Sequence, residues 1–500
     1  MSTNSIGDKF SRLAALRPSR HAVTRESSPV EGDAGDAAQL LGATVERNRY
    51  GEHLAIRRWF PTPEPCLEFN DARRTRALKM LLPNVASEVG SKRGATPADV
   101  LAEDPAQWLF LDTETTGLAG GSGTYAFLVG VAWWDSGGLQ IEQFFMRDFA
   151  EEHSLLLALD ERMAERRVLV TFNGKSFDWP LLETRYRMTR CIAPRIPAMH
   201  LDLLHPARQL WRPRLASVRL AELERHVLRV SPGSRLDWSR DCDVDSSQIP
   251  EIYFNFVRGG SAEPLVPVIR HNQMDLRGLA ALAGHMLEMI AGGQDDESTD
   301  EPNPSEESLD LYGLSRLLGQ RGEPKLARRT CQAALAAGLP GEHDRAARRD
   351  LARLAKRAGD VRCAVEMWEG LLSTVPARPP IPRLKGTHSE QSLTLDRILM
   401  RGAAGSRAPF AGDGQLRAAL EACEQLAIHF EHRARALDRA SQLTRHGLAL
   451  IHRAIGARRA DDYSSDKEFR RKWAERFERR LSRLERKIST SVSFPSSAAD

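Results

Sequence analysis

The stretch that decides the fold is Trp108–Gly117, which reads WLFLDTETTG. Its first four residues are large and apolar, as in a buried strand, and an acidic turn rich in threonine follows directly. In an extended segment, side chains two residues apart point the same way, so Asp112 and Glu114 present their carboxylates at one place. Like charges held this closely are tolerated around a hard divalent cation such as Mg²⁺ or Mn²⁺. The alternative interpretation is a polar turn where the strand ends.

A second strand-and-turn pattern follows later in the chain. Residues Val168–Phe172 (VLVTF) are apolar, and the loop after them contains Asn173, Lys175 and Asp178. Asn173 is suited to close the turn, which would place Asp178 in the first turn of a helix. Since parallel strands bring their carboxyl ends together, we expect this loop to lie beside the first pair of acids. Lys175 is suited to contact a phosphate or to remain a solvated surface charge.

A third pattern lies at residues 271–275 (HNQMD), inside a segment with helical spacing from about Leu265 to Ile290. A spacing of four places His271 and Asp275 one turn apart on the same face. An aspartate buried among Leu and Ala is costly without a partner, and a metal ion would be such a partner. The alternative is that both side chains face solvent.

The elements around these patterns indicate an α/β domain. Segments 125–134 and 139–145 are strand-like and flank a DSGG hairpin turn, and 151–166 has helical spacing. Three successive strands followed by alternating helix and strand predict a mixed β-sheet flanked by helices. Upstream, residues 42–60 contain two short β-like runs that predict a hairpin.

In this order, the three patterns resemble the motifs of the DEDD superfamily of 3′–5′ exonucleases, which have a ribonuclease H-like fold. The similarity is closer to the YprB-like family of predicted exonucleases. It runs from about Trp108 to Leu287 and is carried by FLDTETTGL (110–118), GTYAFLVG (123–130), TFNGKSFD (171–178), HLDLLHP (200–206) and IPEIYF (249–254). The joint occurrence of these stretches in order is highly specific.

The resemblance implies two-metal hydrolysis of phosphodiester bonds. Asp112, Glu114, Asp178 and Asp275 would hold two Mg²⁺ or Mn²⁺ ions, one activating water and the other stabilising the leaving oxygen. His271, with an ordinary pKa near 6.5, would orient or deprotonate that water and complete the catalytic set. Superfamily members with a histidine place it five residues before the last aspartate, whereas the spacing of His271 is that of the tyrosine subclass. The resemblance therefore supports Asp275 as a ligand more strongly than His271 as a base.

Four further residues are expected on the substrate side of the site: Thr115, Asn173, Lys175 and Asp202. Asp202 ends an expected strand and fits two roles, an auxiliary acid or the cap of a helix at 203–211. The expected substrate is nucleic acid, either DNA or RNA, since the contacts to the 2′-OH and to groove shape that separate them leave no motif here.

Composition excludes several classes of protein. The 71 Lys and Arg residues against 67 Asp and Glu residues give +4, which excludes a highly basic coat for nucleic acid. The six cysteines form no C-x-x-C pair, which argues against a zinc ribbon or a disulfide framework and for a reducing compartment. The longest near-apolar run, Tyr125–Trp134, is about half of a membrane span, and the N-terminus lacks a secretory h-region. We expect a cytoplasmic protein without membrane contact.

The 500 residues suggest several domains. We expect a flexible arm at 1–41, a small region with the β-hairpin at 42–105, the ribonuclease H-like exonuclease domain at 106–291, an acidic linker at 292–308, a helical repeat domain at 309–488 with an insert at 375–414, and a tail at 489–500.

The helical domain shows a repeat of 37 residues, in which Leu314, Leu317, Gly322, Ala327 and Leu335 recur as Leu351, Leu354, Gly359, Ala364 and Leu372. A further shift of 76 residues keeps the apolar positions and puts Arg435 at the glycine position. Helix pairs of this period resemble tetratricopeptide repeats, which the YprB-like family commonly carries, and they imply a protein partner. The alternative is an ordinary Ala/Leu helical bundle. The basic amphipathic segment 469–487 either caps the array or contacts nucleic acid or a partner.

Two other functions stay open at this point. The first is a non-catalytic adaptor that binds nucleic acid through the nuclease fold and recruits partners through its repeats. The second is an endonuclease that uses the same acidic site. The presence of all four acids weighs against a loss of catalysis.

Overall fold

The computed structural model describes the chain in twelve stretches. These are residues 33–61, 77–78, 80–81, 104–117, 123–135, 137–193, 195–234, 236–241, 243–292, 304–373, 413–456 and 464–492. Most of the expected N-terminal arm, most of the acidic linker and nearly all of the insert at 375–414 lie outside the described residues.

Within the described residues, seven strands form one mixed sheet in the order β1-β2-β5-β4-β3-β6-β7. The strands are β1 Thr44–Asn48, β2 Gly51–Pro61, β3 Trp108–Thr115, β4 Ala126–Asp135, β5 Gly138–Phe145, β6 Val168–Thr171 and β7 Met199–Asp202. From β1 to β3 in this order the neighbours pair antiparallel, whereas β6 is parallel to β3 and β7 is parallel to β6. The mixed sheet expected from the sequence is confirmed.

The predicted N-terminal hairpin is present, but it is not a separate unit. Strand β2 pairs with β5 along its length, from Leu54 opposite Phe145 to Pro61 opposite Gly138, so the hairpin forms one edge of the sheet. Helix α2 (Asp33–Leu41) packs Ala37, Ala38 and Leu41 into the same core. The expected division at residue 105, and a flexible arm reaching residue 41, are therefore wrong. The apolar side chains of α2 and β2 are buried only against the other strands of the sheet, so these two elements belong to the same domain.

Helices cover both faces of the sheet. They are α5 Glu152–Glu165, α6 Asp178–Thr189, α7 Leu204–Trp211, α8 Leu220–Leu223, α9 Ile249–Val257 and α10 Leu265–Gly292, with the short helical turns η1 Pro105–Gln107, η2 Phe149–Glu151 and η3 Glu224–Leu228. The alternation of β3 explains the two layers, because Trp108 and Phe110 enter one core cluster and Leu109 and Leu111 enter the other.

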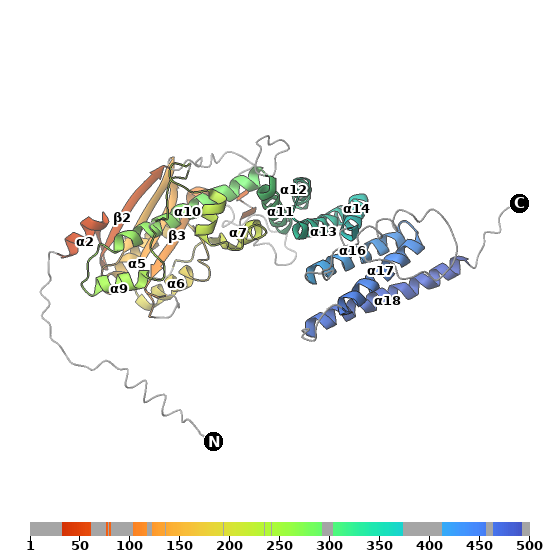
Figure 1. Cartoon of the computed structure of the whole chain (residues 1–500). Helices are drawn as coiled ribbons and strands as arrows, with labels where there is room; N and C mark the ends of the chain where they lie inside the picture. Colours follow the sequence, from red (N-terminus) through yellow and green to blue (C-terminus); the bar gives the residue numbers. More distant parts are fainter. Residues whose placement is uncertain are drawn as a thin grey trace, which may run out of the picture.

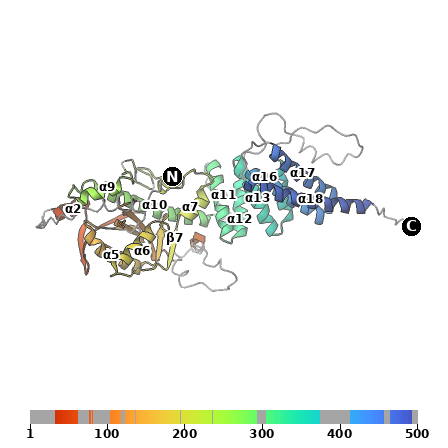
Figure 2. The same ribbon diagram turned by 90° about the horizontal axis from the view of Figure 1, so that it is seen from below.

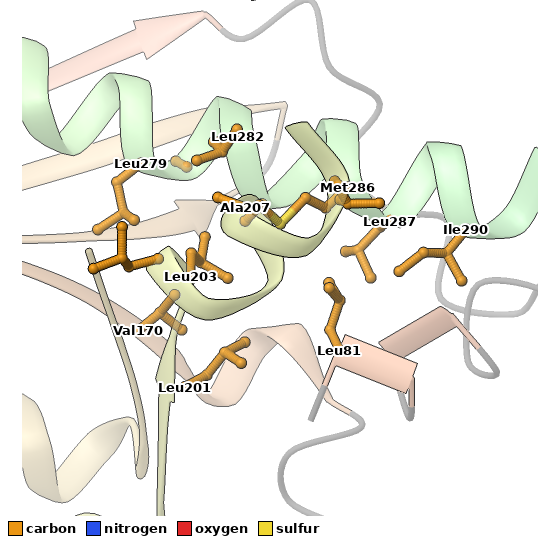
Figure 3. Close-up of a cluster of buried hydrophobic side chains, with 14 of the residues drawn as sticks. Leu81, Val170, Leu201, Leu203, Ala207, Leu279, Leu282, Met286, Leu287 and Ile290 are labelled. Atoms are coloured by element: carbon orange, nitrogen blue, oxygen red, sulfur yellow. The ribbon is translucent and has the colours of Figure 1, made fainter. Parts of the chain in front are cut away.

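The long helix α10 crosses the sheet over β3, β4 and β5 (Figure 1). Its C-terminal half buries Leu279, Leu282, Met286, Leu287 and Ile290 against α7, β6 and β7 (Figure 3). Each such side chain contributes roughly 1.5–3 kcal/mol when fully buried, so this cluster fixes α10 firmly on the sheet.

The C-terminal part is entirely helical where it is described. Its helices are α11 Pro304–Gln320, α12 Pro324–Ala336, α13 Gly341–Arg357, α14 Val361–Ser373, α16 Asp413–His432, α17 Leu437–Gly456 and α18 Ser464–Val492. Consecutive helices pack as the pairs α11–α12, α13–α14 and α16–α17. The turns within these pairs contain Gly322 at φ +81, Gly359 at φ +78 and Arg435 at φ +53. The third turn thus keeps the left-handed conformation without the glycine.

The helical region adjoins the sheet domain, since its first helix, α11, lies beside α7 (Figure 2). Helix α11 lies against α7 so closely that a Cβ on Gly313 would come within 1.9 Å of the Leu210 carbonyl oxygen. Leu314 and Leu317 enter the sheet domain's own core cluster, and Arg214 Nε donates to Asp310 Oδ1 at 2.8 Å. Helix α11 also begins at Pro304, inside the segment expected to be a linker. The expected domain boundary at 308 is therefore wrong, because this helix belongs to both packing units.

The basic helix α18 packs on α16 and α17. Phe477 and Leu484 are buried in the helical cores, and Arg480, Arg483 and Lys487 all contact Glu431 of α16. These contacts support the capping interpretation of this segment. No helix in the described part of the chain combines the length and apolar character needed to cross a membrane.

Candidate active site

Two carboxylates of β3 and one of α6 meet at the carboxyl edge of the parallel strands. Strand β3 carries Asp112 and Glu114 and runs parallel to β6, so the β6–α6 loop returns beside it. Asp178 is the first residue of α6, as the sequence predicted. The Thr113 hydroxyl donates to Asp178 Oδ1 at 2.6 Å and joins the two elements.

Asn272 fixes α10 against the sheet at this same edge. Its side chain is fully buried, its Nδ2 donates to Asp112 Oδ2 at 2.8 Å, and its Oδ1 accepts from Gln143 Nε2 at 2.8 Å. Gly130 of β4 makes this approach possible, since a Cβ there would lie 2.0 Å from Asn272 Oδ1. The contact sets the rotation of α10 and so the direction of its neighbouring polar residues.

His271 and Asp275 of α10 face the acids of the sheet. His271 Nε2 lies 3.9 Å from Glu114 Oε1 and 3.6 Å from Asp275 Oδ2. On the other side of the ring, His271 Nδ1 lies 2.7 Å from Asp243 Oδ1. The structure therefore brings together Asp112, Glu114, Asp178, His271 and Asp275, and the alternative in which the α10 pair faces solvent does not apply.

The charges of this cluster perturb one another. Burial raises the pKa of Asp112 well above its ordinary value, and the negative charges of Asp275, Asp178 and Glu114 raise it further. The pKa of Glu114 is raised to about 8, first by burial, which outweighs the opposing charge of His271, and with smaller contributions from the neighbouring aspartates. Burial also raises the pKa of Asp178. Burial and mutual repulsion therefore favour the uncharged forms of these acids.

The pKa of His271 is also raised, which for a histidine favours the charged form. Burial alone would lower its pKa, but the hydrogen bond to Asp243 and the charges of Asp275 and Glu114 raise it to about 9. The ring is consequently a cation at neutral pH in the protein alone, where it partly balances the acids.

Arg240 is the second cation of the site, and it was not anticipated from the sequence. Its guanidinium contacts Asp275 Oδ1, Glu224 at 2.7 Å and Asp243 Oδ2 at 2.9 Å. Asp243, Arg240 and Asn272 are thus three site residues missed in the sequence. A local signal existed in SRDCDVD (239–245), a charged run next to the IPEIYF stretch.

A divalent cation is chemically suited to this donor set. The carboxylate oxygens are ligands that Mg²⁺ and Mn²⁺ prefer, and a cation would relieve the repulsion that raises the pKa values of Asp112 and Glu114. Within the described residues, no three His, Cys, Asp or Glu side chains are gathered closely enough to form a ready metal-binding group. The oxygens are instead turned to Asn272, Thr113 and Arg240, which satisfy Asp112, Asp178 and Asp275 respectively.

The residues expected on the substrate side have mixed surroundings. Thr115 Oγ1 donates to the Gly117 carbonyl at 2.9 Å, and Lys175 is exposed. Asn173 adopts a left-handed φ of +68, which closes the β6–α6 loop.

Asp202 holds this loop in place rather than facing a substrate. It is 3% exposed, and it accepts from the backbone amides of Asn173 at 2.8 Å, Lys175 at 3.2 Å and Leu204 at 3.0 Å. A buried carboxylate with its oxygens occupied by the backbone is not available as an auxiliary acid, so the structural alternative applies.

Comparison with known proteins identifies the sheet domain. Residues 109–287 match the RNase_H superfamily. They form a domain of that superfamily. The chain is also 31% identical over 263 residues to the uncharacterised protein YprB of Bacillus subtilis (strain 168). That match covers 52% of this chain and 59% of YprB, so the chain spans less than two thirds of the length of the relative.

The superfamily domain spans the strands and helices that carry the acidic cluster. Its match begins at Leu109 in β3 and ends at Leu287 in α10, so it contains each of the five gathered residues. The part of the chain that matches this superfamily is therefore the part that holds the acidic cluster.

Proposed function

We propose that this protein is a metal-dependent 3′–5′ exonuclease of the DEDD type, which hydrolyses phosphodiester bonds of DNA or RNA. The observation that carries the proposal is the convergence of Asp112, Glu114, Asp178 and Asp275 from three elements on one edge of the sheet. The pKa values of Asp112 and Glu114 are raised by burial and by repulsion from the neighbouring acids. Such perturbed clusters are typical of catalytic sites.

The four carboxylates would hold two Mg²⁺ or Mn²⁺ ions. Bound there, the ions would supply Lewis-acid stabilisation and an activated water. The chain's own contribution is to hold these acids in place, through Thr113 for Asp178 and through Asn272 for Asp112. The second hydrogen bonds of ligand side chains commonly set their orientation in this way.

His271 is the proposed base. Its Nε2 faces Glu114 and Asp275, and Asp243 holds the other ring nitrogen at 2.7 Å. In the protein alone, without a cation bound to the acids, His271 remains protonated because its pKa is about 9. Neutralising the acids removes part of the cause of that shift, so the ring then becomes able to accept a proton near neutral pH.

The helical region is proposed to be a protein-interaction domain of tetratricopeptide-like repeats. Left-handed turns at Gly322, Gly359 and Arg435, and buried alanines at Ala327 and Ala364, follow the repeat seen in the sequence. Because α11 packs into the sheet domain, a partner bound to the helices would be held at a set position relative to the nuclease site.

The proposal is tested by digestion of end-labelled DNA and RNA, single- and double-stranded, with Mg²⁺ or Mn²⁺. We expect stepwise release from the 3′ end and a loss of about 10³-fold or more in Asp112→Ala, because one of the four carboxylates that would hold the ions is removed. The matched control is Asp241→Ala, which removes an exposed aspartate from the loop that carries Arg240 and Asp243. Equal cutting by Asp112→Ala and the wild type would show that the assigned site is wrong.

One further substrate and one ligand titration separate the exonuclease from the endonuclease and from the adaptor. Cutting of a circular single strand would indicate an endonuclease, since an exonuclease has no end to attack. Calorimetric titration with Mn²⁺ should show binding that Asp112→Ala abolishes, whereas an adaptor without catalysis would show neither binding nor cutting.

A further inference from the structure

A cavity of about 420 Å³ lies next to the candidate active site. Its walls come from Phe60 at the end of β2, from Asp237 and Trp238 in the loop before α9, and from Arg270 and Arg277 on α10. Met274 and Ser239 also line the cavity, and they are the chain neighbours of Asp275 and Arg240. The cavity and the acidic cluster are therefore built on the same two segments, α10 and the loop before α9.

Arg277 is a partly buried cation in the wall of this cavity. Its guanidinium lies 4.4 Å from the ring centroid of Phe60 and 4.4 Å from that of Trp238. It donates to the Asp237 carbonyl oxygen at 3.2 Å, and it forms no ion pair with any carboxylate among the described residues. A desolvated cation of this kind is stabilised by an anion.

Arg270 brings a second guanidinium to the same cavity. It is exposed, and it forms no hydrogen bond or ion pair within the part of the chain that the structure describes. Asp237 is the acid of the lining, and its Oδ1 already accepts from the Gly233 amide at 2.9 Å. Two arginines that face one cavity repel each other, and an anion bound between them would attract both and offset that repulsion.

The chemistry of the walls selects the class of anion. Planar guanidinium groups bind phosphate oxygens through paired hydrogen bonds, and the rings of Phe60 and Trp238 hold the guanidinium of Arg277 in position. We propose that this cavity, which we call the arginine pocket (Phe60, Trp238, Arg270, Arg277), binds a nucleotide phosphate. Resting on the proposed function, its occupant is a nucleotide of the substrate strand away from the bond that is cut.

A purely structural role for Arg277 would predict a different result. A guanidinium between two rings also stabilises the fold by packing, so loss of Arg277 alone does not distinguish the two roles. Loss of Arg270 does distinguish them. Its side chain is exposed and has no partner within the described residues, so its removal should not disturb the fold.

The experiment measures binding by the full chain in EDTA, so that no cutting occurs. Fluorescence anisotropy with a labelled oligothymidylate of about 20 nucleotides gives the Kd, and Arg270→Ala should raise it about tenfold. The slope of log Kd against log salt should fall by about 0.7 for each phosphate that the variant no longer neutralises. Arg277→Lys, which keeps the charge and removes the planar group, should also weaken binding. Arg362→Ala, at an arginine whose side chain is 91% exposed on α14, is the charge-matched control and should change nothing.

A second arm uses AMP as a free nucleotide competing with the oligothymidylate. Displacement that depends on Arg270 shows that a single nucleotide suffices, whereas Arg270-dependent binding without displacement shows that the pocket requires the strand. Both results support the arginine pocket. An unchanged Kd and salt slope in Arg270→Ala, at an unchanged melting temperature, would overturn it.

The outcome is separable from that of the proposed function. If the wild type binds through Arg270 but releases no nucleotides with Mg²⁺ or Mn²⁺, the pocket stands and the exonuclease proposal fails. If it cuts normally and Arg270→Ala changes neither the Kd nor the KM, the pocket alone fails.

Discussion

Two buried glutamates in this protein have opposite electrostatic surroundings. Glu114 of β3 lies among aspartates at the edge of the sheet, and its pKa is raised to about 8, first by burial. Glu431 of α16 is also covered, and burial alone would raise its pKa, but hydrogen bonds from Arg483 and Lys487 lower it to about 2. Burial acts to raise the pKa of both carboxyls, and the cations around Glu431 reverse that effect there.

This difference separates a structural acid from a candidate catalytic one. Around Glu431, cations of α18 neutralise the charge within the protein itself, so the carboxylate holds two helices together. Around Glu114, the cations His271 and Arg240 are too few for the nearby acids, and the fold retains repulsion that it does not need for stability. Retained repulsion of this kind is typical of sites shaped for a ligand.

The largest expected effect on stability is at Glu431. Replacing it by Gln leaves Arg480, Arg483 and Lys487 without their carboxylate and should reduce the free energy of unfolding by about 3 kcal/mol. Because the pKa is lowered, this contribution is present above about pH 4.5 and is lost as the pH falls through about 2. Urea unfolding followed by far-UV circular dichroism measures it. Glu485→Gln, which breaks an exposed pair with Arg445, is the control and should cost less than about 1 kcal/mol.

The next largest effect is expected at Asp243, which contacts both cations of the site, His271 and Arg240. Asp243→Ala should lower kcat by about 30-fold, because His271 loses the hydrogen bond that orients its ring. It also removes a cause of the raised pKa of His271, so the pH–rate limb of that residue should move to lower pH. Asp243→Asn keeps an acceptor for Nδ1 and should retain more activity than the alanine variant. Equal rates and pH profiles for Asp243→Ala and Asp241→Ala would exclude this positioning role.

The smallest expected effect has the opposite sign to that at Glu431. In EDTA near neutral pH, Glu114→Gln should raise the free energy of unfolding by about 1 kcal/mol, because burial keeps the Glu114 carboxyl from ionising in the folded protein, whereas it ionises in the unfolded chain. With a raised pKa, the wild-type acid contributes most stability below about pH 4.5 and loses it as the pH rises through about 8. The gain in the variant should therefore grow with pH.

Thermal melts at several pH values measure the gain. Glu251→Gln, at an exposed glutamate of α9, is the control and should show no such trend. Destabilisation by Glu114→Gln, with the same sign as at Glu431, would contradict the contrast between the two glutamates.

Local patterns were sufficient to predict most of the elements that carry the site. Asp112 and Glu114 follow a buried strand run, Asp178 begins a helix, and His271 and Asp275 are one helical turn apart, all as expected from spacing. These features depend on residues close in sequence, for which strand and helix periodicities are reliable guides.

Contacts between distant segments could not be predicted in the same way. Asp243 reaches His271 across 28 residues, and Arg240 reaches Asp275 across 35 residues, through a loop without periodic pattern. Their partners depend on how that loop folds onto α10. The same reason accounts for the two wrong boundaries, since the pairing of β2 with β5 and the packing of α11 on α7 are not visible in either segment alone.

By itself, the sequence determined the mixed α/β class, the helical C-terminal region and the acids that the fold brings together. Only the tertiary structure decided their electrostatic state. Burial and the positions of cations from remote segments make Glu114 a strained acid and Glu431 a stabilising one, although the two residues are of the same type. A pKa depends on distances in space, and those are set by packing between segments that the sequence pattern does not connect.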